Sequence, residues 1–182
     1  MENFQMSGVR HTKVHGRNLM AAVAALALPA ILVSGVALAQ SKGKKDEITI
    51  TITRVKALDR IDVGGGNPDL FARATIAGET IKSPVVKQQT ESKPDWKLTK
   101  VVPRGKTDIK LELLDKDVLN PDDLIDINRV DKKRLLEFTV DTSSCRVAGF
   151  SNGYRCGSKI SRAGLEKKKA EIDFVVSVKK DK

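Results

Sequence analysis

Histidine is nearly absent from this sequence. The 182 residues include only two, His11 and His15, and both lie within the first 39 residues. If that segment is removed, as its composition indicates below, the mature chain has no imidazole to act as a general base, to activate a serine or cysteine nucleophile, or to bind zinc. Most familiar catalytic arrangements are thereby excluded, and the sequence favours a protein that is not an enzyme.

Cysteine and aromatic residues are also scarce. Cys145 and Cys156 are the only cysteines, and aromatic residues make up 4% of the chain. The cysteine spacing differs from Cys-x-x-Cys and no other soft ligand is present, so a zinc or redox pair is not expected. In an exported protein an even number of cysteines predicts a disulfide, which for so short a loop contributes on the order of 3 kcal/mol. The scarcity of aromatic residues counts against a sugar-stacking surface.

The first 39 residues have the composition of a secretory signal peptide. Three basic residues and one acidic residue come first, and an uncharged run, 19–39, then ends in Ala37-Leu38-Ala39. Signal peptidase cuts after such a small-x-small sequence, so we expect cleavage after Ala39 and a secreted or periplasmic protein. The alternative is an uncut anchor, because a run of this length just spans a bilayer, but Pro29 in mid-run favours removal. A short polar linker, 40–47, and one domain, 48–179, would follow.

The mature chain is strongly basic. The whole sequence has a formal net charge of +10 at pH 7, and removing the three basic residues and one acidic residue of the signal peptide leaves +8. A basic surface can bind nucleic acid, anionic lipid or acidic polysaccharide, and charge alone does not choose among them. Export argues against nucleic acid, so anionic lipid and acidic polysaccharide remain as the expected partners.

Alternation of apolar and polar residues predicts a series of β-strands. In 47–55, Ile48, Ile50 and Ile52 alternate with threonines, which is typical of a strand with one buried face. Turn signals separate seven further segments of this kind: 69–76, 79–86, 96–102, 107–114, 124–128, 134–140 and 170–178. The stretch 141–168, which holds both cysteines, is predicted to be a loop. Eight short strands predict an all-β fold, an antiparallel β-sandwich.

Antiparallel topology predicts where the acidic residues gather. If every strand reverses direction, the connections 58–68, 88–95, 115–123 and 141–168 lie at one end of the sandwich. Repulsion among clustered carboxylates calls for a counter-ion, and carboxylates from separate loops suit Ca²⁺, which takes six to eight oxygen ligands. An EF-hand does not fit, because Asn120 falls where its glycine belongs. The aspartates expected at this end are Asp59, Asp62, Asp69, Asp95, Asp115, Asp117, Asp122 and Asp123.

Three segments together resemble a C2 domain: "ITITRVKALDRIDVGGGNPDLFARATI", "KPDWKLT" and "IKLELLDKDVLNPDDLIDI". They match in order an opening strand before an acidic loop, a Pro-x-aromatic after the second loop, and Asp-x-Asp-x5-Asp in the third. The resemblance implies an eight-stranded C2-like sandwich of type II topology, similar to secreted bacterial C2-like proteins. By residue it implies calcium ligands at Asp62, Asp69, Asp115, Asp117 and Asp123, with Asp69 aligned only through a one-residue insertion. Asp122 and Asp126 are interpreted as a turn residue and an outward strand residue.

The resemblance also suggests a surface that binds anionic partners. Val63 and Leu119 stand where lipid-binding C2 domains place apolar loop tips. Four lysines are candidates for a basic lipid-binding patch, although scattered lysines usually only protect exposed strands: Lys87, Lys93, Lys97 and Lys100.

Two functions follow. The leading hypothesis is a secreted, non-enzymatic module that coordinates Ca²⁺ and binds an anionic surface, either phospholipid or an envelope component. The alternative is an envelope polysaccharide-binding or structural sandwich in which calcium is purely structural. A calcium-dependent hydrolase is least favoured, because no nucleophile stands beside a base. The oligomeric state stays open.

Overall fold

The computed structural model describes residues 43–61 and 66–181, which belong to one compact unit, Ser41–Lys182. The predicted signal peptide and cleavage site lie outside the described residues. Within the described part of the chain, every regular element is a strand, and no helix long and apolar enough to cross a membrane is found.

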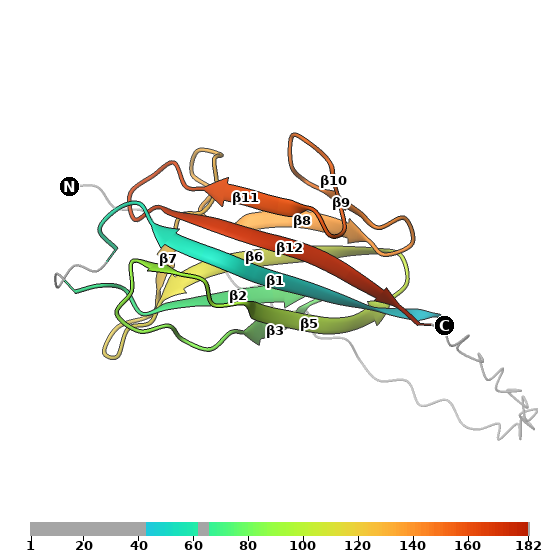
Figure 1. Ribbon diagram of the computed structural model, residues 1–182, viewed down its shortest axis with the longest axis horizontal. Helices are drawn as coiled ribbons and strands as arrows, with labels where there is room; N and C mark the ends of the chain where they lie inside the picture. Colours follow the sequence, from blue (N-terminus) through green and yellow to red (C-terminus); the bar gives the residue numbers. More distant parts are fainter. Residues whose placement is uncertain (1–42, 62–65, 182) are drawn as a thin grey trace, which may run out of the picture. The chain divides into compact units, whose positions relative to one another are not determined.

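The strands form two sheets whose ladders are all antiparallel (Figure 1). The first sheet has the order β11 (Lys159–Ala163), β12 (Ala170–Lys180), β1 (Lys45–Ala57), with β4 (Glu91–Ser92) and β5 (Trp96–Pro103) sharing the other edge of β1. The second has the order β10 (Tyr154–Arg155), β9 (Arg146–Ala148), β8 (Leu136–Asp141), β6 (Lys106–Asp115), β2 (Leu70–Ile76), β3 (Glu79–Lys82), with β7 (Asp123–Ile125) also paired to β6.

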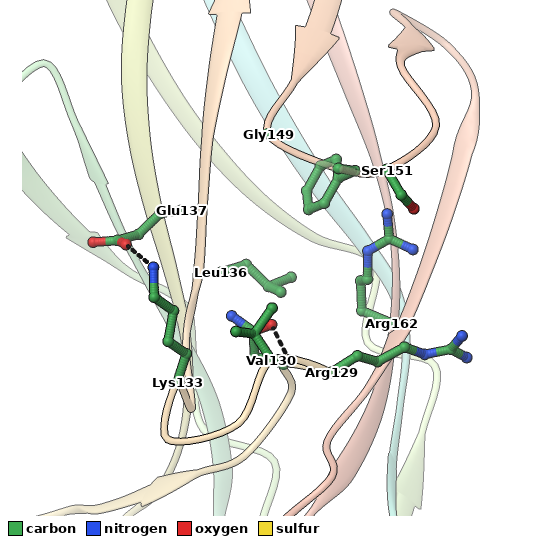
Figure 2. Close-up of a pocket in the computed structure, with 10 residues that line it drawn as sticks. Arg129, Val130, Lys133, Leu136, Glu137, Gly149, Ser151 and Arg162 are labelled. Atoms are coloured by element: carbon green, nitrogen blue, oxygen red, sulfur yellow. Dashed lines mark hydrogen bonds and ion pairs between the residues drawn. The ribbon is translucent and has the colours of Figure 1, made fainter.

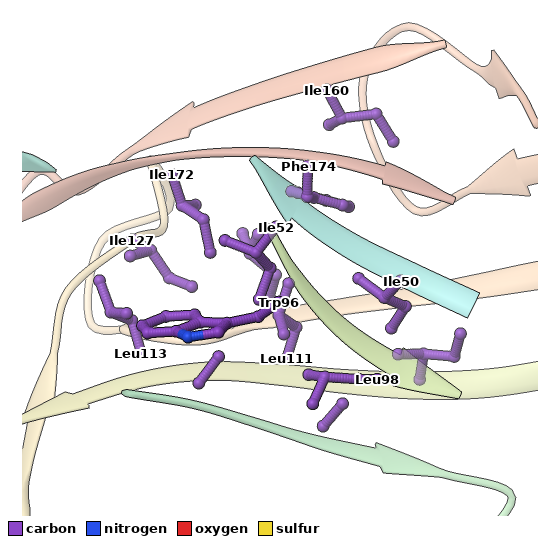
Figure 3. Packing of buried hydrophobic residues seen from close by; sticks show 14 of the residues in the cluster. Ile50, Ile52, Trp96, Leu98, Leu111, Leu113, Ile127, Ile160, Ile172 and Phe174 are labelled. Carbon is purple, nitrogen blue, oxygen red and sulfur yellow. The ribbon is translucent and has the colours of Figure 1, made fainter. Parts of the chain in front are cut away.

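The inner faces of the two sheets enclose one hydrophobic core (Figure 3). The predicted alternation in the first strand is confirmed, because Ile48, Ile50 and Ile52 are fully buried. Phe174 of β12 is also fully buried, and Trp96 at the start of β5 lies in the core with 5% of its surface exposed. The predicted all-β antiparallel sandwich is therefore confirmed, and its core is continuous across both sheets.

Four strands go beyond the eight expected, and they change the interpretation of 141–168. That stretch holds β9, β10 and β11, and β11 pairs with β12 along its whole length. In β11 only Ile160 is a large, fully buried apolar side chain, so the sequence shows no alternation there. The fourth additional strand is the two-residue β4. The expectation of one long loop was wrong.

The chain also fails to reverse between two of the expected strands. β7 pairs with residues 113–115 of β6 and β8 with residues 106–111, and both run antiparallel to β6. They are two pieces of one interrupted strand, with 126–135 between them. The segment after β8 therefore starts at the end of the sandwich opposite to the one expected, because the chain makes one reversal fewer.

The two ends of the domain lie side by side. Asp46 of β1 stands opposite Lys180 of β12 in the sheet register. Arg104 donates to the buried carboxylate of Asp46 through both Nε (3.0 Å) and Nη2 (2.8 Å), and to the backbone oxygen of Asp181 (3.0 Å). The hydrogen bond from Arg104 lowers the pKa of Asp46 to about 2. Arg104 thus adds a link between the start of β1 and the residue after β12, at one end of the ladder that pairs these strands.

Candidate metal-binding loops

Strand register brings three of the predicted calcium ligands to one end of the sandwich. Asp115, the last residue of β6, stands opposite Leu70 of β2 on one side and Asp123 of β7 on the other. The amide of Asp69 donates to Oδ1 of Asp115 (2.6 Å), and the amide of Lys116 donates to the carbonyl of Asp69 (2.9 Å). We call this region, with the described parts of loops 58–69, 116–122 and 164–169, the acidic end.

The side chain of Asp69 also links its own loop to the connection 88–95. Its Oδ1 accepts hydrogen bonds from the backbone amide (2.9 Å) and the side-chain amide (3.3 Å) of Gln88. The carboxylate of Asp69 thus orders two neighbouring loops, and it remains close to Asp115 through its own backbone. One carboxylate therefore combines a structural role with a position suited to a ligand.

The third loop carries a fourth predicted ligand, Asp117, and the expected turn residue Asp122, in different settings. Asp117 is half-buried, and its backbone amide donates to the carboxylate of Asp122. Asp122 also pairs with Lys116 (2.8 Å), and this hydrogen bond is the main reason that the pKa of Asp122 is lowered. Asp122 was expected to be a solvated turn residue, but only 16% of its side chain is exposed and its carboxylate is hydrogen-bonded within the loop.

A lysine that the sequence analysis did not single out, Lys168, lies at the acidic end. The ammonium of Lys168, in the loop before β12, forms an ion pair with Oδ2 of Asp123. The backbone amide of Lys168 also donates to Asp59 (3.2 Å). Part of the negative charge at this end is therefore neutralised by a residue of the domain itself.

Buried Asp126 positions the loop that carries Lys168. Expected to face outward, Asp126 is fully buried, and its Oδ2 accepts from the amides of Leu165 (2.7 Å) and Glu166 (2.6 Å). Its own amide donates to the carbonyl of Lys168 (2.9 Å). Gly164 is required at the start of this loop, because a Cβ there would lie 2.2 Å from the carbonyl oxygen of Asp126. The expectation for Asp126 was wrong, since its carboxylate serves the loop backbone.

The remaining metal candidate and one loop-tip candidate, Asp62 and Val63, lie outside the described residues. In 43–61 and 66–181, no group of three acidic, histidine or cysteine side chains is arranged to hold a metal ion. Leu119 is 94% exposed at the tip of the third loop, and so is its neighbour Val118, which the sequence analysis did not single out. Two adjacent apolar side chains thus project from the acidic end.

The four candidate surface lysines have different surroundings. Lys97 lies on the outer face of β5, with 65% of its side chain exposed, 3.8 Å from Asp95. Lys100 pairs with Glu79 of β3 and so connects the edges of the two sheets. Lys87 and Lys93 are both exposed in the connection between β3 and β5.

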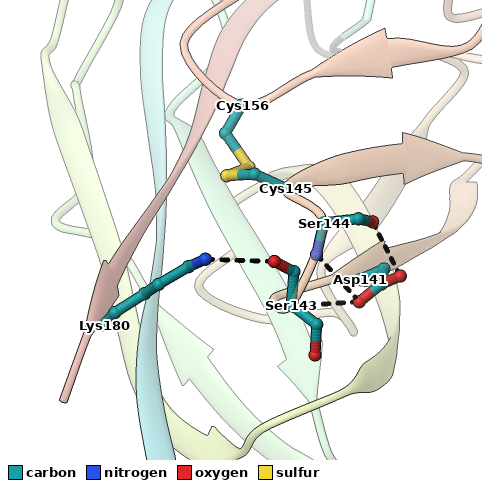
Figure 4. The surroundings of a disulfide bond; sticks show 6 residues. All are labelled: Asp141, Ser143, Ser144, Cys145, Cys156 and Lys180. Atoms are coloured by element: carbon teal, nitrogen blue, oxygen red, sulfur yellow. Dashed lines mark hydrogen bonds between the residues drawn. A yellow bond between two sulfur atoms is a disulfide. The ribbon is translucent and has the colours of Figure 1, made fainter. Parts of the chain in front are cut away.

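The predicted disulfide is present between Cys145 and Cys156, whose Cα atoms are 5.3 Å apart (Figure 4). The amide of Cys156 also donates to the carbonyl of Cys145 (3.0 Å). The bond closes a hairpin formed by β9 and β10 at the edge of the second sheet. Just before Cys145 in the chain, the hydroxyl of Ser144 donates a hydrogen bond to the carboxylate of Asp141, and this hydrogen bond lowers the pKa of Asp141.

A model of the C2 domain family matches residues 46–143, which is more than half of the chain. The chain belongs to the C2 family. Solved structures with similar folds include a C2 domain of plant extended synaptotagmin 1, at 10% identity and a TM-score of 0.51, covering 75% of this chain and 95% of that one. A structure that holds two C2 domains of extended synaptotagmin 2 matches at 18% identity and a TM-score of 0.50, covering 84% and 48%.

Human GIVD cytosolic phospholipase A2 also matches, at 11% identity and a TM-score of 0.52. The match covers 76% of this chain but only 18% of the phospholipase, so the likeness concerns a small part of that enzyme. At these identities the solved structures bear on the fold of this C2 domain alone. A comparison with curated protein sequences found no match.

Proposed function

We propose that this C2 domain protein is a non-enzymatic module that binds Ca²⁺ through the aspartates of its acidic end. The observation that carries the proposal is the position of Asp115, which lies next to the backbone of Asp69 and opposite Asp123 in the register. Asp117 follows on the same loop. Carboxylates from separate loops that meet in this way provide the oxygen donors that Ca²⁺ prefers.

The donor chemistry fits calcium, but the side chains are not arranged around an ion. Asp123 is paired with Lys168, and the described acidic side chains form no ready group of three. Binding therefore requires the side chains to rotate and Lys168 to leave Asp123. The displaced ion pair reduces the net gain from binding, so we expect an affinity in the range of extracellular modules, about 0.1 to 1 mM.

The apolar loop tip supports a second component of the proposal, attachment to an anionic phospholipid surface. Val118 and Leu119 lie between the aspartates of the third loop and are each 94% exposed. Full burial of two such side chains contributes at most about 3 to 6 kcal/mol. Bound Ca²⁺ would neutralise the adjacent carboxylates, which otherwise repel an anionic surface. Membrane attachment is therefore expected to depend on calcium.

Calorimetric titration of Ca²⁺ into the protein that begins at Ser41 tests the calcium site. Asp117→Asn should weaken binding strongly, and Asp115→Asn/Asp117→Asn should abolish it. Asp131→Asn is the matched control, because Asp131 is exposed in a loop outside the acidic end. Since Asp115 also accepts a structural hydrogen bond, the single Asp117 variant keeps the test valid if the double variant unfolds. Heats that are unchanged in Asp117→Asn would contradict the proposal.

Sedimentation with phosphatidylserine vesicles tests the membrane component. Binding should require Ca²⁺ and should be lost in Val118→Ser/Leu119→Ser, while the calcium titration of that variant stays unchanged. Binding that persists in chelator would instead assign the interaction to basic residues elsewhere on the surface.

We also infer that residues 1–39 are a signal peptide and that the protein acts outside the cytoplasm. The basic start, the uncharged run and the Ala37-Leu38-Ala39 ending support this inference. Mass spectrometry of the exported protein should find Gln40 as the first residue. A mass that includes residues 1–39 would favour an uncut membrane anchor.

A further inference from the structure

A pocket forms where the disulfide-closed hairpin folds over β8. Gly149, in the turn between β9 and β10, has φ +109°, and a Cβ there would lie 2.9 Å from Cα of Phe138. The hairpin can therefore lie directly on the backbone of β8. This places the ring of Phe150 5.4 Å from that of Phe138 and 5.8 Å from that of Tyr154. Of these three rings, Phe150 lines the pocket and forms its aromatic wall.

Arg162 extends from the other sheet across this wall. Its guanidinium lies 4.3 Å from the ring centre of Phe150 and 5.5 Å from that of Tyr154. Stacking on aromatic rings holds a guanidinium flat and leaves the N–H groups at its edge for other partners. Arg162 donates to the carbonyl of Ser161 (3.2 Å), and no carboxylate of the described residues pairs with it. A preorganised cation thus stands at the rim of the pocket.

The opposite wall is the segment 128–135, and it adds two more cations. Asn128 shapes this segment, accepting from the amide of Val130 (3.0 Å) and donating to the carbonyl of Leu135 (2.5 Å). Figure 2 shows Arg129 and Lys133 on this segment, with Arg162 across the pocket.

The pocket has a volume of about 260 Å³, and its lining is positively charged. The lining contains three basic residues, Arg129, Lys133 and Arg162, and one acidic residue, Glu137, whose carboxylate lies 3.8 Å from the ammonium of Lys133. Leu136 supplies an apolar floor together with the aromatic wall. The volume is below the ~300–1,000 Å³ of drug-sized ligand sites, so the pocket suits a smaller molecule.

We propose that this pocket binds a small ring-shaped molecule that carries a carboxylate or a phosphate, such as a sugar acid or a sugar phosphate. The guanidinium groups of Arg129 and Arg162 present paired N–H donors, which match the geometry of both oxyanions. The apolar and aromatic side chains contact the body of the ring. Ser151, at the rim beside Arg162, offers a hydroxyl for a neutral substituent (Figure 2). The residues that line the pocket include none of the predicted calcium ligands.

Titrations of the ¹⁵N-labelled protein that begins at Ser41 with glucuronate, glucose 6-phosphate, inorganic phosphate and glucose test this proposal. At least one of the first three should shift the amide signals of Gly149 and Ser151 in a saturable way, whereas uncharged glucose should not. Glucuronate and glucose 6-phosphate distinguish a carboxylate ligand from a phosphate ligand, and inorganic phosphate measures the contribution of the oxyanion alone.

Variants make the test specific to the pocket. Arg162→Ala and Arg129→Ala should each weaken binding about tenfold or more, as expected for the loss of a hydrogen bond to a charged group. Arg155→Ala is the matched control, because Arg155 lies on the same hairpin but does not line the pocket. Arg129 is exposed on a loop, so its variant is expected to fold even if Arg162→Ala does not. Equal shifts with glucose, binding that survives in Arg129→Ala, or no saturable shift at about 10 mM of any anion would overturn the proposal.

Discussion

Removal of the disulfide should cost a calculable amount of stability. The sequence separation of Cys145 and Cys156 is 11 residues. In the chain-entropy model, closing a loop of that size lowers the entropy of the unfolded chain by about 9 cal/mol/K, which corresponds to about 2.8 kcal/mol at 25 °C. For a domain of this size, that loss lowers the melting temperature by about 6 to 11 °C. We expect Cys145→Ser/Cys156→Ser to show both changes.

The structure also predicts where the effect is concentrated. Among the described residues, the hairpin pairs with β8 at three register positions, and β9 and β10 share two. Without the covalent link, few hydrogen bonds oppose opening of the hairpin. Amide hydrogen exchange at Val147 and Tyr154 should therefore accelerate more than exchange in β1 or β12.

Urea unfolding of the Ser/Ser variant and the oxidised parent provides the measurement. The parent in reductant is the control, and its midpoint should match that of the variant. A loss below about 1 kcal/mol would refute the reasoning, because it would mean that the aromatic contacts of Phe150 and the packing of Gly149 hold the hairpin without the link. A changed m-value would indicate instead that the unfolded or native state changes its compactness.

Three further predictions concern charge and close packing. Lys168→Met should raise the calcium affinity about two- to fivefold, which corresponds to the free energy of one exposed ion pair. The same variant should lower the melting temperature in chelator. Calorimetry measures the first effect and a thermal melt the second. Arg104 lowers the pKa of Asp46 to about 2, so the stabilisation from this ion pair is complete above about pH 4 and is lost as the pH falls through 2. Asp46→Asn should therefore flatten the dependence of the melting temperature on pH between these values. An unchanged slope would count against a stabilising role of the pair. Gly164→Ala should cost more than about 2 kcal/mol in urea unfolding, because its Cβ would lie 2.2 Å from a backbone oxygen, whereas Gly153→Ala, with no atom within 4 Å, should be nearly neutral.

Much of the sandwich could be predicted because its long strands carry buried apolar residues at a period of two over part of their length or in a continuous run. The isoleucines of β1 and the hydrophobic run of β6 are local signals, and they locate the strands that form the centre of each sheet. The convergence of Asp69 and Asp115 followed from antiparallel reversal over the first connections, where the chain does turn back each time. Local pattern and simple topology were sufficient there.

Other features depend on contacts between residues far apart in the sequence. Nothing near Asp126 indicates that its carboxylate would accept hydrogen bonds from a loop some forty residues later. Lys168 belongs to the connection 141–168, which was expected at this end, but its ion pair with Asp123 depends on that contact and was not predicted. The interrupted strand formed by β7 and β8 looks in the sequence like two ordinary strands, because each piece keeps its own alternation.

The ion pair between Asp46 and Arg104 lies where the chain enters and leaves the sandwich, which has a practical consequence for attaching the domain to a tag or a support. β1 has 13 residues, so the point where the chain enters the sandwich lies about 40 Å from the aspartate loops at its far end, and the chain leaves beside that same point. A purification tag, a fused partner or a sensor chip linked to either terminus would hold the domain by its base. The loops would then be presented outward from the support, free to meet a lipid bilayer.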